Sequence, residues 1–272
     1  MLLDQKVEGS LIIIGGAEDK KGEKNILKEV CSKLDKDNDE LVIATVATDS
    51  PAEAGAQYRN IFEELGVKKV SVLNVNFRED AYFNDNISMV ERAALIFFTG
   101  GDQLKITSML GGTPLYNSFS RGYEKGCVYV GTSAGASVMS DIMVVEGPDE
   151  ESPKKCTLKM APGLGLIKGV IIDQHFAQRG RIGRLLVGVA ENPQSLGIGI
   201  DEDTAIMVNK EGIFQVIGSG AVYILDGSTI TRTNVSEQFQ NEILSIFDVK
   251  MHVLKSGDRF DLNVRKPFGE KQ

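Results

Sequence analysis

The chain has 272 residues, 42% of them hydrophobic, and a formal net charge of -8 at pH 7. Because that length can bury a substantial core, we expect one α/β domain over residues 1–272, in which residues 205–272 form a β-rich C-terminal extension. The acidic balance and the lack of a broad basic face argue against nucleic acid as a partner.

No apolar run is long enough to cross a bilayer, and residues 1–8 lack the basic start and apolar stretch of a signal peptide. Cys31, Cys127 and Cys156 form an odd, widely spaced set without the spacing of a metal site. Such cysteines suit a reducing compartment. The sequence therefore predicts a cytoplasmic protein without a membrane partner, a metal ion or another cofactor.

Short apolar segments alternate with helical patterns through the first half of the chain. This alternation predicts a doubly wound, mostly parallel sheet flanked by helices, the architecture of flavodoxin-like and class I glutamine amidotransferase-like domains. The expected strands are 11–14, 41–47, 70–75, 95–99 and 128–130, and the expected helices include 22–34 and 52–65.

From residue 197 onward, closely spaced strands replace the alternation, which is typical of antiparallel pairing. Polar residues and Pro153 in segment 149–159 predict an exposed loop. The expected later strands are 205–208, 213–216, 221–225 and 246–254.

A glycine-rich turn, residues 15–19, follows the first expected strand. A turn of this kind can cradle a phosphate, so a non-catalytic nucleotide-binding module is one alternative. Its spacing is not Gly-x-Gly-x-x-Gly, and Glu18 and Asp19 would repel a phosphate. The turn alone is therefore weak support for nucleotide binding.

The expected strand 128–130 runs directly into Gly131-Thr132-Ser133-Ala134-Gly135, a Gly-x-Ser-x-Gly sequence. Small-residue turns of this composition are common, but a strand before and a helical segment after it favour a nucleophile elbow. Such an elbow exposes the Ser133 hydroxyl at the sheet edge. The Ala134 amide, at the start of the next helix, would then stabilise an oxyanion.

A serine nucleophile needs a base, and the chain has two histidines. His252 lies in an alternating segment near the C-terminus and is expected to be structural or at the surface. His175 follows the apolar run 170–172, and a parallel sheet gathers its active-site groups at the carboxyl ends of its strands. We therefore expect His175 to be the base.

The carboxylate that orients the histidine has two candidates. Asp173 lies two residues before His175, on what is expected to be an extended segment. Glu202 lies in an acidic loop, 201–203, between two expected strands, where a solvated turn is the alternative. The spacing leaves the choice between Asp173 and Glu202 open.

Four motifs in this order, 99–103, 131–136, 173–176 and 199–205, resemble those of the cyanophycinase family of serine hydrolases, which is related to aspartyl dipeptidase, or peptidase E. The resemblance extends from about residue 9 to residue 205. A glutamine amidotransferase would need a cysteine where Ser133 stands. Four ordered motifs are far more specific than any one of them.

The resemblance implies Ser133 as the nucleophile, His175 as the general base and Glu202 as the orienting acid. It implies an oxyanion hole formed by the amides of Ala134 and Gly101, and a homodimer. The implied substrate-binding residues are Gln103, Asp173, Gln174, Arg179, Arg181 and Arg184.

The three arginines of segment 178–184 also form a local positive cluster in an acidic chain. Guanidinium groups bind carboxylates in a two-pronged fork, although arginines entering a helix can equally face solvent. The resemblance implies that the substrate is cyanophycin, a polyaspartate with arginine on its β-carboxyls, cut to β-Asp-Arg dipeptides. Peptidase E-like hydrolysis of small Asp-X dipeptides is the nearest alternative.

Overall fold

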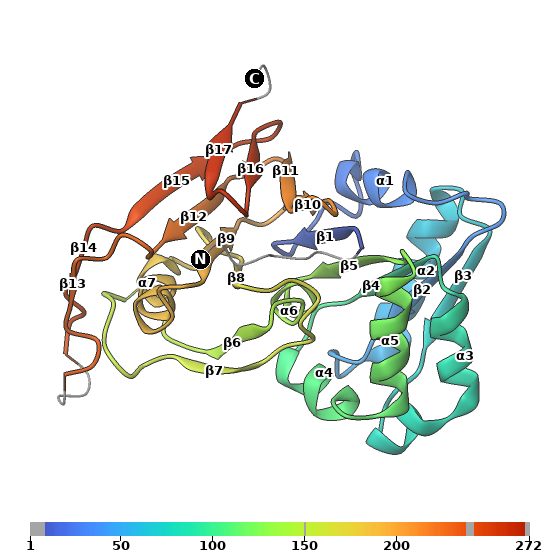
Figure 1. Cartoon of the computed structure of the whole chain (residues 1–272). Coiled ribbons are helices and arrows are strands. Elements are labelled where there is room, and N and C mark those ends of the chain that lie inside the picture. The colour runs from blue at the N-terminus through green and yellow to red at the C-terminus, as the bar shows by residue number, and fades with distance from the viewer. Residues whose placement is uncertain (1–8, 150, 238–241, 270–272) are drawn as a thin grey trace.

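The computed structural model describes residues 9–149, 151–237 and 242–269 (Figure 1). Its largest sheet has a parallel part formed by β1 (Leu11–Ile14), β2 (Glu40–Ala44), β3 (Lys69–Leu73), β4 (Leu95–Phe98) and β5 (Val128–Thr132). The antiparallel part consists of β10 (Thr204–Val208), β11 (Ile213–Gly218), β16 (Arg259–Asp261) and β17 (Lys266–Phe268). The strand order is β17-β16-β11-β10-β1-β5-β4-β2-β3.

Helices cover both faces of the parallel part (Figure 1). One face carries α1 (Asn25–Cys31) and α2 (Pro51–Glu64), and the other carries η1 (Arg78–Tyr82), α3 (Asn84–Arg92), α4 (Gln103–Leu110) and α5 (Pro114–Glu124). Successive strand residues point to opposite faces, so Ile12 and Ile14 pack with the first set while Leu11 and Ile13 pack with the second. The doubly wound arrangement predicted from the alternation is therefore present.

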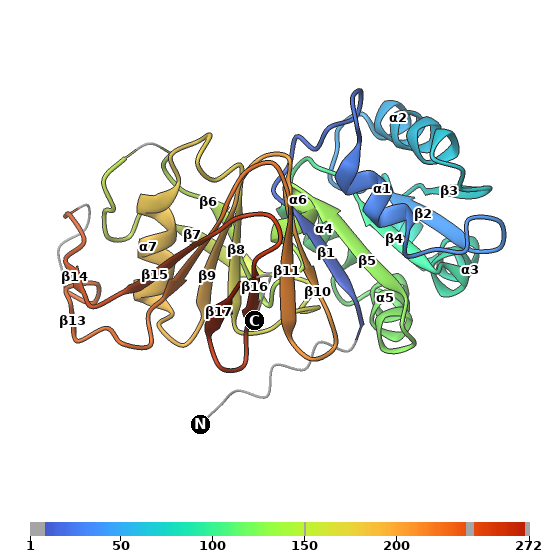
Figure 2. The same ribbon diagram turned by 90° about the horizontal axis from the view of Figure 1, so that it is seen from above.

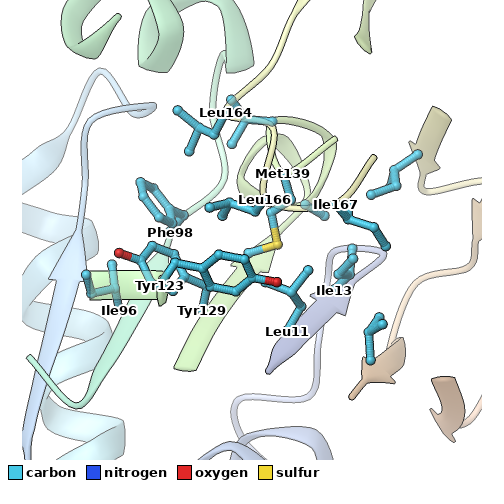
Figure 3. Close-up of a cluster of buried hydrophobic side chains, with 14 of the residues drawn as sticks. Leu11, Ile13, Ile96, Phe98, Tyr123, Tyr129, Met139, Leu164, Leu166 and Ile167 are labelled. Atoms are coloured by element: carbon cyan, nitrogen blue, oxygen red, sulfur yellow. The ribbon is translucent and has the colours of Figure 1, made fainter. Parts of the chain in front are cut away.

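A cluster of buried side chains lies beneath β1, β4 and β5 (Figure 3). The ring centroid of Phe98 lies 5.3 Å from that of Phe119 and 6.2 Å from that of Tyr129. The buried Tyr129 hydroxyl donates a hydrogen bond to the Phe119 carbonyl oxygen at 2.7 Å. Burial of each such side chain contributes about 1.5–3 kcal/mol, which stabilises the strands that carry the candidate site.

A second, four-stranded sheet lies beside the first (Figure 2). It consists of β8 (Val170–Gln174), β9 (Leu196–Ile200), β12 (Val222–Asp226) and β15 (Lys250–Leu254), in the order β15-β12-β9-β8. One face packs against α7 (Ile182–Glu191), and the other faces the core beneath the large sheet. The C-terminal strands are thus divided between two sheets, because β10 leaves β9 to pair with β1.

The remaining described elements are short: α6 (Ala134–Ser137), the hairpin of β6 (Ile142–Glu146) with β7 (Lys159–Pro162), and β13 (Arg232–Thr233) paired with β14 (Ile246–Phe247). The prediction of a single strand over 246–254 is wrong. Asp248 interrupts it with a left-handed backbone, φ +64°, so β14 and β15 join different sheets.

Two further expectations differ in detail. The helix expected at 22–34 begins only at Asn25, because the Asp19 carboxylate accepts hydrogen bonds from the amides of Lys21, Gly22 and Lys24 and holds them in a turn. In the loop expected at 149–159, the Lys155 side chain is fully buried and forms an ion pair with Glu242 at 3.0 Å.

Candidate active site

Ser133 lies at the carboxyl end of β5, in the abrupt turn between that strand and the single-turn helix α6. Its backbone has φ +54° and ψ -113°, a region that residues other than glycine rarely occupy. Strain of this kind persists only where the surrounding structure enforces it, and it concentrates at functional sites. The strand-to-helix elbow expected around residue 133 is present.

The Ser133 hydroxyl and the His175 ring face each other. Ser133 Oγ lies 3.0 Å from His175 Nε2 and 3.5 Å from Gln174 Oε1. His175 follows directly after β8 and also has a left-handed backbone, with φ +47°. This turn brings the imidazole from the second sheet to the Ser133 hydroxyl at the end of the first.

The other ring nitrogen, His175 Nδ1, lies 2.6 Å from Glu202 Oε1. Glu202 lies in the short connection between β9 and β10, where the chain passes from one sheet to the other. Asp173, the other acid left open by the spacing, bonds instead to the Arg184 guanidinium group of α7. Serine, histidine and glutamate therefore form one continuous hydrogen-bonded series.

Burial lowers the pKa of His175 below its ordinary value, because it disfavours the charged imidazolium. The hydrogen bond that His175 Nδ1 donates to Glu202 opposes this effect, whereas the positive charges of Arg179 and Arg181 act in the same direction as burial. The lowered pKa favours the neutral imidazole, the form that can accept a proton from a serine hydroxyl.

Two of the three arginines in the 178–184 cluster are buried and bonded within the protein. Arg184 Nε donates to Asp173 Oδ2 at 2.6 Å, and Arg181 Nη1 donates to the Gln174 carbonyl oxygen at 2.7 Å. Asp149 approaches both arginines, at 2.8 Å from Arg181 Nε and 3.2 Å from Arg184 Nη1. No sequence pattern marks Asp149, which lies in a polar loop.

The other expected site residues lie around the same elbow. Gln103 is the first residue of α4, and its Nε2 donates to the Val144 carbonyl oxygen of β6 at 2.7 Å. The Gly100–Gly101 turn adjoins Ser133, since a Cβ atom on Gly100 would lie 3.3 Å from Ser133 Cβ. Arg179 is exposed, with no side-chain hydrogen bond or ion pair to any residue that the structure describes.

His252 lies away from this series, in β15, with its ring centroid 6.0 Å from that of Phe260. Across the described ranges, no group of three or more His, Cys, Asp or Glu residues is arranged to hold a metal ion. In the same part of the chain, no helix has the length and apolar character needed to cross a bilayer.

Residues 11–216 match the family model described as Peptidase family S51. The chain belongs to peptidase family S51. Its curated relatives extend the likeness across almost the whole sequence. The protein named "Cyanophycinase" in Trichormus variabilis is 39% identical over 266 residues, covering 97% of this chain and 89% of that protein.

Other curated relatives carry the same name. The "Cyanophycinase" of Geminocystis herdmanii is 38% identical, with 98% of each chain covered. That of Synechococcus elongatus is 35% identical, covering 95% of this chain and 81% of the relative. The resemblance inferred from the four ordered motifs is confirmed by these relatives and by the S51 match.

Solved structures show the same fold at low sequence identity. A peptidase from an acI-B1 Actinobacterium superposes with a TM-score of 0.63 at 24% identity, covering 89% of this chain and 98% of that one. A putative peptidase E protein from Listeria monocytogenes EGD-e gives 0.55 at 16% identity, covering 78% and 99%. The predicted α/β class of this S51 peptidase, with β strands added at its C-terminal end, is confirmed.

Proposed function

We propose that this S51 peptidase is a cyanophycinase, which hydrolyses the polyaspartate backbone of cyanophycin and releases β-Asp-Arg dipeptides. The curated relatives that carry this name are 35–39% identical over nearly the full chain. The observation that carries the proposal is the continuous hydrogen bonding of Ser133, His175 and Glu202 at a strained elbow. This is the arrangement that acyl transfer by a serine requires.

Ser133 is the nucleophile in this mechanism. Its Oγ attacks the scissile carbonyl carbon while His175 Nε2 accepts its proton, and the same proton later goes to the leaving amine. Glu202 accepts the hydrogen bond from His175 Nδ1, which keeps Nε2 free as the base and stabilises the imidazolium. Water then attacks the acyl ester, with His175 again acting as the base.

The amides of Ala134 and Gly101 are the proposed donors to the oxyanion. Ala134 follows the nucleophile at the first position of α6, and Gly101 belongs to the turn that adjoins Ser133. Donors placed in advance at the position of the developing negative charge are worth roughly 10²–10³ in kcat each. Because α6 has a single turn, its amide rather than a helix dipole supplies this stabilisation.

The proposed substrate pocket combines Gln103, Gln174, Asp173 and the three arginines. Arg179 is the arginine whose side chain is exposed and unpaired within the described chain, so it meets an aspartyl carboxylate first. The carboxylate of Asp149 is 40% exposed, whereas Asp173 is 1% exposed. Asp149 therefore covers the solvent side of Arg181 and Arg184, and a substrate carboxylate reaches that pair by displacing it.

The decisive experiment incubates the protein with purified cyanophycin and, in parallel, with Asp-X dipeptides, and identifies the products by mass. We expect β-Asp-Arg from the polymer, and Ser133→Ala should abolish its release while leaving the circular dichroism spectrum unchanged. Ser137→Ala is the matched control, because Ser137 is a buried serine of α6, the short helix that follows Ser133. Cleavage of dipeptides alone would favour the peptidase E-like alternative, and full activity of Ser133→Ala would remove the serine from the mechanism.

We also propose a cytoplasmic location and a homodimer. The three cysteines are all unpaired, as expected in a reducing compartment. The homodimer rests on the resemblance alone. Light scattering after size exclusion measures the assembly state, and a monomer would contradict it.

A further inference from the structure

The turn after β1, which the sequence raised as a possible phosphate cradle, contacts all three segments that carry the proposed catalytic residues. Three consecutive carbonyl oxygens, those of the last β1 residue and the first two turn residues, each accept a hydrogen bond from a backbone amide of one of those segments. The bonds are Ser133 N to Ile14 O at 3.1 Å, His175 N to Gly15 O at 2.8 Å and Asp203 N to Gly16 O at 2.9 Å.

Two amides of the same turn already donate hydrogen bonds within the protein. The Gly15 amide donates to the Thr204 carbonyl oxygen at 2.9 Å, and the Asp19 amide donates to Asp203 Oδ1 at 2.9 Å. A phosphate cradle needs free amides directed at the ligand, whereas this turn directs carbonyl oxygens toward its neighbours. Its contacts therefore suit the alignment of neighbouring segments.

Gly16 shows how closely the turn is shaped around the base. A Cβ atom at this position would lie 2.4 Å from both Cε1 and Nε2 of His175, and the backbone has φ +100°. Only glycine fits this combination of space and conformation. The turn thus forms one wall against the imidazole ring.

Glu18 connects this turn to the nucleophile strand through its side chain. The residue is 3% exposed, and its Oε2 accepts a hydrogen bond from Thr132 Oγ1 at 2.5 Å. Its Oε1 accepts the Tyr58 hydroxyl and lies 3.3 Å from Lys20 Nζ. A buried carboxylate is costly unless it is bonded in this way, so each partner is needed to hold it.

We propose that Glu18 is a positioning residue for the nucleophile. Thr132 immediately precedes Ser133, whose left-handed backbone relaxes unless its neighbours restrain it. Glu18 holds the Thr132 side chain against the β1 turn, and the turn holds the base. Together they keep Ser133 Oγ within hydrogen-bond reach of His175 Nε2. The inference rests on the serine mechanism proposed above.

The test compares Glu18→Gln and Thr132→Val with the unmodified protein. We expect kcat to fall by about 10- to 100-fold in each, since small misplacements of reacting groups cost that much, with KM and the acid limb of the pH profile unchanged. The double variant should lose no more than the worse single one, because both remove the same bond. Thr132→Ser keeps the hydroxyl and should restore most of kcat.

Two controls separate positioning from a general loss of stability. Thr45→Val removes another buried threonine hydroxyl just beyond a strand end, at β2, and Asp226→Asn removes another buried carboxylate, in β12. Both should keep kcat, even where Asp226→Asn lowers the melting temperature. Unchanged kcat in folded Thr132→Val, or an equal fall in the controls, would overturn the proposal. Valine is nearly isosteric with threonine, so Thr132→Val by itself tests the positioning role of Glu18 if Glu18→Gln does not fold.

A fluorophosphonate probe makes the result independent of the substrate. The rate at which it modifies Ser133 should fall in Glu18→Gln and Thr132→Val in parallel with kcat. Wild-type labelling of Ser133 without cleavage of cyanophycin would contradict the proposed substrate and leave the Glu18 test intact. Absence of labelling in the wild-type protein would contradict both the serine mechanism and the role of Glu18.

Discussion

At the scale of single residues, opposing effects act on the pKa of His175, the proposed base. Burial and the charges of Arg179 and Arg181 lower the pKa of His175, while its hydrogen bond to Glu202 raises it. Arg179 is the exposed member of this set, so its charge can be removed without leaving a buried partner. The pH at which activity falls on the acid side of the profile therefore depends on the charge of Arg179.

Arg179→Gln should move the acid limb of the kcat/KM profile to higher pH. The base acts when it is neutral, that is, above its pKa, and loss of a nearby positive charge makes protonation easier and raises that pKa. A pH profile of kcat/KM with a short substrate measures the shift. Arg92→Gln, which removes an exposed arginine from α3, should leave the limb in place. A shift to lower pH in Arg179→Gln would contradict the electrostatic account.

At the scale of elements, the Asp173–Arg184 pair ties β8 to α7. Both side chains are almost fully buried, and Arg184 binds Asp173 through two nitrogen atoms. Removing one partner of a buried pair leaves the other charge uncompensated. The pair therefore holds the helix against the strand that leads to His175, whatever it contributes to substrate binding.

Asp173→Asn should lower the free energy of unfolding by about 3 kcal/mol, as measured by urea denaturation. Glu91→Gln is the matched control, because its ion pair with Arg121 joins α3 to α5 at the surface, where the side chains are 42% and 48% exposed. That substitution should cost less than about 1 kcal/mol. Equal, small losses in both variants would show that the buried pair is not structurally important.

At the scale of the whole molecule, the two sheets are interleaved along the chain (Figure 2). β1 pairs with β5 on one side and with β10 on the other, with Leu11 opposite both Tyr129 and Val208. Residues 205–272 supply strands to both sheets. We therefore propose that residues 1–272 form one domain that unfolds as a unit.

Loss of secondary structure, loss of tyrosine packing and loss of activity should coincide on denaturation. Far-ultraviolet and near-ultraviolet circular dichroism report the first two, and the absence of tryptophan leaves tyrosine and phenylalanine as the aromatic reporters. Coincident transitions are the mark of a single cooperative unit. A separate transition for the C-terminal strands would instead indicate an independent domain.

The sequence by itself determined the parallel strands and the elbow, and it was enough to select one histidine as the candidate base. Apolar runs such as Leu11–Ile14 are local signals, and the segment around Ser133 combines strand, glycines and helix within a few residues. With only two histidines in the chain, position after an apolar run was sufficient to favour His175. Each of these signals lies within a short stretch of sequence, where the pattern of neighbouring residues determines the local structure.

The four motifs implied Glu202 as the partner of His175 only through the resemblance, and the tertiary structure brings the two side chains together. Only the tertiary structure decided where Asp149 lies and what the first glycine turn contacts. Glu202 reaches the ring from 27 residues away, and Thr132 meets Glu18 across 114 residues. The spacing favoured neither Asp173 nor Glu202 as the partner of His175. From the sequence, Glu18 was predicted only to repel a phosphate at the first glycine turn. Such partners depend on how strands from two sheets are brought together, a property of packing over the whole chain that no local pattern encodes.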